Sequence, residues 1–143
     1  MPPVLRLPLL LTLAFAALGI SLPPLTVDIL DRDGVPRGKA QVFQNYVRLQ
    51  GPDGAPRGAI GVVMAEGSAR LFLVGPDRQR KLLGWSRNHR LFDAQNKLVG
   101  YYSWTPIWSY VYDAELKRVG QAQCLAYQGV CAAGVAGFLL GLL

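Results

Sequence analysis

The chain has 143 residues and a formal net charge of +6, from 15 Lys and Arg against 9 Asp and Glu, with a sequence pI near 9.7. This length leaves room for one domain once the apolar ends are set aside. The basic surplus favours anionic partners such as lipid headgroups or acidic glycans, although a surplus of this size also serves simply to keep a domain soluble.

Residues 1–24 predict a secretory signal peptide. Arg6 precedes an apolar stretch, and Ala14 and Ala16 have the small-x-small spacing of a signal peptidase site. Without cleavage the same stretch, interrupted by Pro8, would form a short membrane anchor. Positive charge stays on the cytoplasmic side, so Arg6 directs the following chain outward. We therefore expect an exported protein on the periplasmic side of a bacterial membrane, in the cell envelope.

Residues 25–122 contain an internal repeat. An eight-residue phrase that closes on Gly recurs at residues 31–38, 51–58, 77–84, 93–100 and 113–120. Its first Asp can accept hydrogen bonds from backbone N–H groups two residues on, and a central Gly or Asn tolerates a positive φ. The closing Gly would permit a bulge or the close approach of a neighbouring backbone. Each phrase therefore predicts a turn between two strands.

The segments between these phrases are strand-like, and none of them has convincing helical periodicity. Strands are expected at residues 26–30, 42–49, 60–64, 70–74, 89–92 and 108–112. The predicted fold class is mainly β, an antiparallel meander of hairpin repeats with about eight to ten strands.

This repeat resembles the bacterial MORN and WG hairpin-repeat families, in which Asp or Asn, a turn, and a Gly opening the return strand recur every twenty-odd residues. The resemblance covers residues 27–122. The Tyr-x-Gly opening of MORN units and the Trp-Gly pair of WG units are missing. It implies an extended or twisted antiparallel sheet that acts in binding or scaffolding, and it assigns no individual site residue.

Residues 123–143 carry no charge and predict an apolar, glycine-striped helix. The stripe is a glycine zipper that recurs every fourth residue, at Gly129, Ala133, Gly137 and Gly141. Such a stripe allows close approach of another helix in lipid, by self-association or with another membrane protein. We expect insertion in a membrane, because the run approaches the roughly 20 residues needed to span. The alternative is a helix packed on its own β domain, with the glycines allowing close contact to the sheet.

Cys124 and Cys131 are the two cysteines. In one continuous helix they would lie about 10 Å apart, too far to bridge, and this is the expected arrangement. If the helix starts after Cys131, they would close a small disulfide in an oxidising envelope.

Few residues are arranged for catalysis. His89 is the only histidine, and no serine elbow, phosphate loop or carboxylate-rich metal pattern accompanies it. The recurrent aspartates are expected to cap turns rather than to bind calcium, because each turn offers only one or two carboxylates. We therefore expect no enzymatic activity, no cofactor and no metal.

The densest basic segment spans residues 78–90. Strand alternation would place Trp85, Arg87 and His89 on one face, which suits an anionic lipid headgroup or glycan better than nucleic acid. A solvated turn and an edge strand guarded by charge is the alternative. The residues expected to contact an anionic partner are Arg78, Arg80, Lys81, Trp85, Arg87 and His89.

A second cluster is aromatic and comprises Tyr102, Trp104, Trp108 and Tyr110. These residues share parity, so two strands joined near Pro106 would display them on one face. Cross-strand packing in the core is the default explanation. An aromatic surface at the bilayer interface, or one that stacks on a glycan, is the functional alternative.

Together these features predict a non-enzymatic, membrane-associated structural or adaptor protein of the envelope, which presents a basic and aromatic β surface. The alternative is a soluble periplasmic module that binds a lipid or glycan on the sheet and folds the tail against it.

Overall fold

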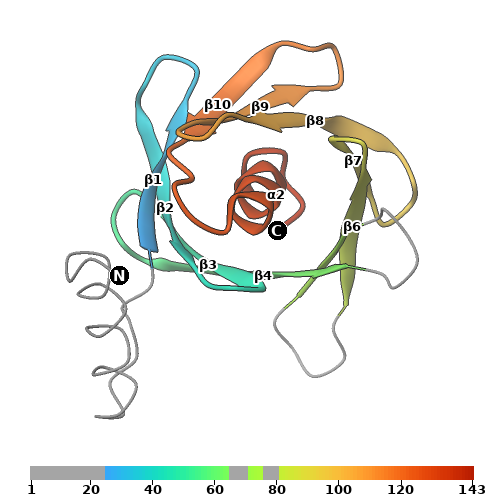
Figure 1. Ribbon diagram of the computed structural model, residues 1–143, viewed down its shortest axis with the longest axis horizontal. Coiled ribbons are helices and arrows are strands. Elements are labelled where there is room, and N and C mark those ends of the chain that lie inside the picture. The colour runs from blue at the N-terminus through green and yellow to red at the C-terminus, as the bar shows by residue number, and fades with distance from the viewer. Residues whose placement is uncertain (1–24, 65–70, 76–80) are drawn as a thin grey trace, which may run out of the picture.

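The computed structural model describes residues 25–64, 71–75 and 81–143. They form an antiparallel meander of ten strands that closes into a barrel around one helix (Figure 1). The elements are β1 (Leu25–Asp31), β2 (Pro36–Val42), β3 (Tyr46–Gln50), β4 (Pro56–Met64), β5 (Leu71–Val74), β6 (Leu82–Arg87), β7 (Arg90–Asp93), β8 (Leu98–Trp104), β9 (Ser109–Asp113), β10 (Arg118–Ala122) and α2 (Gln128–Leu139). The predicted mainly-β fold class and the strand number are confirmed, and the pairing of β1 with β10 adds closure.

The expected strands differ in their limits from those in the structure, and two of the differences have a clear local reason. Residues 42–49 form the end of β2, a turn and the start of β3, with the Phe43 N–H donating to the Tyr46 carbonyl at 2.9 Å. The strand expected from His89 begins one residue later, because Asn88 and His89 have φ values of 52° and 64°. Two consecutive positive φ values are typical of the tight two-residue hairpin turn.

The turn phrases that begin with Asp at residues 31, 93 and 113 have the predicted chemistry, whereas the phrase at residues 51–58 begins with Gly51 and uses Asp53 to bind the Ala55 N–H. The Oδ1 atom of the first residue accepts hydrogen bonds of 2.9 to 3.0 Å from the N–H groups two and four residues on, in Asp31, Asp93 and Asp113. The fourth residue has a positive φ at Gly34, Gly54, Asn96 and Leu116. Leu116 is the exception to the expected Gly or Asn, which are the residues that tolerate this conformation best.

Four of the closing glycines, Gly38, Gly84, Gly100 and Gly120, lie where the backbone of the next hairpin comes close. A Cβ atom at any of them would collide with a carbonyl oxygen of that hairpin's first strand. A register shift accompanies each of the five hairpins. The predicted close approach and bulge are therefore both found.

The same glycines, together with Gly58, provide the surface on which the C-terminal segment packs. Five apolar side chains at the end of the chain lie against the five closing glycines, in the pairs Phe138 and Gly38, Leu139 and Gly120, Leu140 and Gly100, Leu142 and Gly84, and Leu143 and Gly58. The turn phrases join the strands into five hairpins, which are β1–β2, β3–β4, β5–β6, β7–β8 and β9–β10. From Phe138 to Leu143 the tail contacts the first hairpin, then the fifth, the fourth, the third and finally the second. The repeat and the C-terminal segment therefore fit each other hairpin by hairpin.

Helix α2 lies inside the barrel (Figure 1), and every residue from Cys131 to Gly137 is buried. Around it, most inward side chains of the strands are apolar, including Ile29, Leu49, Ile60, Leu73 and Val111. A helix enclosed on all sides needs no polar face, which explains why this run is uncharged all round.

The expected membrane insertion of residues 123–143 is not the arrangement found. The helix has 12 residues and packs on its own β domain, which was the alternative. It ends because Gly141 has a φ of 80° and the Leu142 N–H donates to the Gly137 carbonyl at 2.8 Å, a glycine-terminated helix end. The inner wall of the barrel supplies the apolar cover that lipid was expected to supply.

In the described part of the chain, no helix combines the length and the apolar character needed to cross a membrane.

Cys124 and Cys131 form a disulfide, so the expectation that they stay unbridged is wrong. The helix begins at Gln128, which leaves Cys124 in the preceding irregular segment and brings the two Cα atoms to 5.8 Å. The start of the helix is also held by the Gln128 side chain, whose Nε2 donates to the Pro106 carbonyl at 2.8 Å.

Replacing both Cys124 and Cys131 with Ala should lower the free energy of unfolding by about 2 kcal/mol, because the bridge restricts the unfolded chain. Urea denaturation would measure the change. Adding reductant should lower the stability of the wild type by a similar amount and leave the double variant unchanged. Equal stability of the two proteins without reductant would show that no bridge forms.

Candidate functional site

The structure keeps only part of the basic face that the sequence predicted. Arg78 and Arg80 lie outside the described residues, and Lys81 is exposed just before β6. Trp85 lies on the outer wall, where its ring stacks on Phe92 at 4.2 Å and its Nε1–H donates to Asn96 Oδ1 at 2.8 Å. His89 is not on this strand, because β6 ends at Arg87 and the turn redirects the chain. Trp85 and Arg87 therefore share the outer face of β6, as expected, whereas the expected place of His89 on the same face is wrong.

A different row of side chains crosses the outer wall from β6 to β10. Its members pair directly across neighbouring strands, in the order Arg87, Arg90, Tyr101, Tyr112 and Arg118. We call these five residues the Arg–Tyr ladder. Directly opposed residues of antiparallel strands project from the same face. Their sequence neighbours Ser86, Leu91, Tyr102 and Val111 are buried, so the ladder faces outward.

The ladder concentrates positive charge beside aromatic rings. Arg87 and Arg90 are exposed and directly opposed, and neither forms an ion pair with a described residue. Like charges in this position destabilise a pair of strands. Arg118 lies 6.0 Å from the ring centroid of Tyr110, within range of a cation–π interaction. The sequence prediction named Arg87 alone of these five residues. Arg90 stands in the same basic segment, but its position opposite Arg87, and the alignment of Tyr101, Tyr112 and Arg118 with the pair, depend on the strand register.

The aromatic cluster of β8 and β9 is divided between two faces. Trp104 pairs with Ser109 and Tyr102 with Val111, so residues 105–108 form a four-residue connection and shared parity does not give a shared face. Tyr102 points inward and is 3% exposed, whereas Tyr110 is on the outer wall. Trp108 lies in the connection itself. The prediction of one aromatic surface is therefore wrong, and the default of core packing holds for Tyr102.

His89, Tyr102 and Trp104 stack on one another near the turn between β6 and β7. The His89 ring centroid lies 4.5 Å from Trp104 and 5.7 Å from Tyr102. The Tyr102 hydroxyl and Ser86 Oγ are 2.6 Å apart, and burial raises the pKa of Tyr102. The His89 side chain is therefore used in ring stacking with Tyr102 and Trp104. Among the described residues no group of three or more His, Cys, Asp or Glu side chains is placed to hold a metal ion.

The turn aspartates are occupied by their own turns. At Asp31 the Val35 N–H is the main group holding the pKa of the carboxyl below its usual value, and Arg37 adds an ion pair at 2.9 Å. Asp93 and Asp113, which are partly buried, bind backbone N–H groups in the same way.

The small-residue stripe of the tail is partly enclosed. Ala133 is fully buried, and a Cβ atom at Gly137 would lie 2.9 Å from Ile60 Cδ1. Gly129 and Gly141 have open space around them. Pairing of this stripe with another helix stays a prediction, and it requires α2 to leave the barrel.

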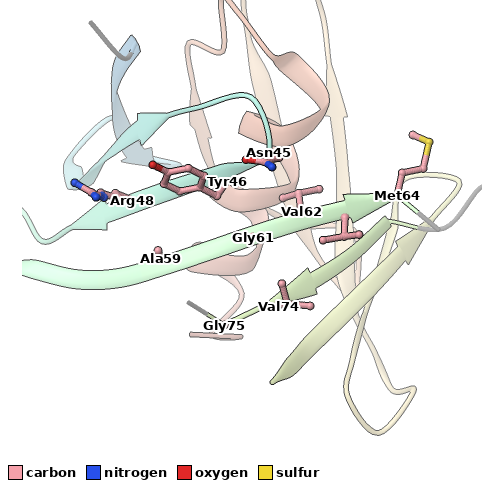
Figure 2. A pocket seen from close by; sticks show the side chains of 10 residues that line it. Asn45, Tyr46, Arg48, Ala59, Gly61, Val62, Met64, Val74 and Gly75 are labelled. Atoms are coloured by element: carbon pink, nitrogen blue, oxygen red, sulfur yellow. The ribbon is translucent and has the colours of Figure 1, made fainter. Parts of the chain in front are cut away.

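A hollow of about 590 Å³ opens on the outer wall over β3, β4 and β5 (Figure 2). Small residues of β4, Ala59 and Gly61, form its floor, while Tyr46 and Arg48 of β3 border one side. Val74 of β5 borders the other side. The sequence carried a signal for this hollow in the small residues of β4, but their outward direction depends on the register.

No protein-family model matches the chain, and neither does any curated protein or solved structure. The resemblance to hairpin-repeat families therefore depends on the turn phrases alone.

Proposed function

We propose that this protein is a non-enzymatic structural or adaptor protein of a bacterial cell envelope, membrane-associated on the periplasmic side, which holds an anionic surface on its Arg–Tyr ladder. The observation that carries the proposal is the direct opposition of Arg87 and Arg90 on the outer wall, with no described counter-ion. An anionic headgroup between the two guanidinium groups would relieve their repulsion. The neighbouring Tyr101 and Tyr112 suit a boundary between polar and apolar surroundings.

The disulfide between Cys124 and Cys131 supports the location. Disulfides persist in oxidising compartments such as the periplasm and are rare in the cytosol of mesophiles. This agrees with the signal peptide predicted for residues 1–24.

The second candidate is a soluble periplasmic module that binds a lipid or glycan. The enclosure of α2 in the barrel favours it, because the tail then provides no anchor. Cell fractionation at low ionic strength separates the two. An adaptor attached through its ladder should sediment with membranes and be released by high salt, since salt screens exposed charges. A soluble module should stay in the periplasmic fraction at both salt concentrations.

The decisive variant is Arg87→Gln with Arg90→Gln. Co-sedimentation of the purified protein should show binding to vesicles rich in phosphatidylglycerol and little binding to phosphatidylcholine vesicles. Each basic residue near an anionic membrane contributes about 1 kcal/mol, so the double variant should bind about 30-fold more weakly.

The matched control is Lys39→Gln with Arg57→Gln, which removes the same charge from exposed positions on β2 and β4, two strands that carry no ladder residue. If the control variant lost as much vesicle binding as the ladder variant, the binding would depend on net charge and not on the ladder, which would contradict the proposal. If the wild type binds polygalacturonate but neither type of vesicle, the glycan-binding module is the correct function.

A further inference from the structure

The hollow on the outer wall is formed by small side chains in two neighbouring rows of the sheet. Gly61 pairs with Tyr46 on one side and with Val74 on the other, and Ala59 pairs with Arg48. The space above Gly61 is bordered closely, since a Cβ atom there would lie 2.9 Å from Val74 Cγ2. The centre of the hollow is therefore backbone and methyl groups between taller walls.

One wall of the hollow is held in place before any ligand arrives. The rings of Phe43 and Tyr46 stack with centroids 4.3 Å apart, and the Arg48 guanidinium lies 5.7 Å from the Phe43 centroid. Arg48 is exposed and forms no ion pair with a described residue. A guanidinium that is positioned by an aromatic ring and lacks a counter-ion can receive an acidic group with little loss of side-chain freedom.

The other end of the hollow is apolar and open. Val63 is 39% exposed and Met64 is 70% exposed, and Figure 2 shows Met64 at the end of β4 far from Arg48. Five residue steps separate Ala59 from Met64, which corresponds to about 17 Å along a strand. The hollow therefore has a cation at one end and an apolar track leading from it.

We propose that this hollow binds a single-chain anionic amphiphile, with its apolar chain along Ala59, Gly61 and Val63 and its acidic head on Arg48. The chemistry is that of a fatty acid or of one acyl chain of an anionic lipid. It is a second site, separate from the Arg–Tyr ladder.

Other classes of ligand fit the hollow less well. A peptide cannot add as a strand, because β3, β4 and β5 are each paired on both sides within the closed barrel. A sugar requires a set of hydrogen-bonding groups, whereas the floor consists of Ala59, Gly61 and valine side chains.

Isothermal titration with dodecanoate, below its micelle concentration, tests the site. The wild type should bind dodecanoate saturably and at least about tenfold more tightly than dodecyltrimethylammonium, which has the same chain and the opposite charge. Arg48→Gln should remove this preference. Ala59→Leu should fill the floor and abolish binding of both probes.

Two control variants separate this site from the ladder and from general charge effects. Lys39→Gln, an exposed cation on the adjacent strand β2, should bind dodecanoate as the wild type does. Arg87→Gln with Arg90→Gln should also leave dodecanoate binding unchanged, so that failure of the ladder and failure of the hollow are distinguishable.

Dodecanoyl lysophosphatidylglycerol identifies the source of the amphiphile. Tighter binding than dodecanoate indicates a lipid, and weaker binding indicates a free fatty acid. The proposal is overturned if the wild type shows no saturable binding, or if folded Arg48→Gln and Ala59→Leu bind dodecanoate as the wild type does.

Discussion

Replacing Val135 with Asp should unfold the protein. Val135 is fully buried in α2, inside the barrel. An ionised carboxylate without a partner in an apolar interior costs several kcal/mol, which is a large part of the stability of a domain of this size. Loss of the β signal in far-UV circular dichroism, or a fall of at least about 3 kcal/mol in the free energy of unfolding measured in urea, would show the effect.

The matched control is Leu125→Asp, which makes the same chemical change outside the barrel. Leu125 is 55% exposed, so its replacement should change the free energy of unfolding by less than about 0.5 kcal/mol. If Val135→Asp were as stable as the wild type, the tail would not fill the barrel, and membrane insertion of residues 123–143 would be the better description.

The second large effect is expected at a closing glycine. In Gly100→Ala the new Cβ atom would lie 2.6 Å from Leu140 Cδ1 and would collide with the Tyr112 carbonyl oxygen. The leucine can turn away, but the carbonyl belongs to the paired strand β9 and cannot move without disturbing the ladder of hydrogen bonds. We expect a loss of at least about 2 kcal/mol, measured by urea or thermal unfolding.

Gly129→Ala provides the comparison, since it adds the same methyl group where nothing lies within 4 Å. Gly129 is in the first turn of α2, so Ala there should stabilise the protein by up to about 1 kcal/mol. Similar effects of the two substitutions would mean that the closing glycines are not required for the contact between hairpins and tail.

The turns were the most predictable part of the fold. Asp31, Asp93 and Asp113 bind N–H groups two and four residues away, and contacts of such short range are visible in a linear sequence. The sequence predicted less well which side chains point to the same face of the sheet. Trp85 and His89 were separated by a two-residue turn, and Tyr102 and Tyr110 by a four-residue connection. A change of one residue in such a connection moves every later side chain to the opposite face.

The candidate site could be predicted only in part for the same reason. Arg87 and Arg90 stand in one basic segment and oppose each other across a two-residue turn, whereas Tyr101, Tyr112 and Arg118 join them through pairings with β8, β9 and β10. These later pairings have no signature in the basic segment, because they depend on the register between neighbouring strands.

The sequence by itself determined the mainly-β class, the five turn phrases and the apolar, uncharged character of the tail, since each follows from local composition and turn chemistry. Only the tertiary structure decided that the sheet closes and that the tail fills it. Burial of an apolar helix is favourable in lipid or in a protein interior, and composition does not distinguish the two. The closing glycines favour burial of the tail inside the barrel, because together they leave room for the side chains from Phe138 to Leu143.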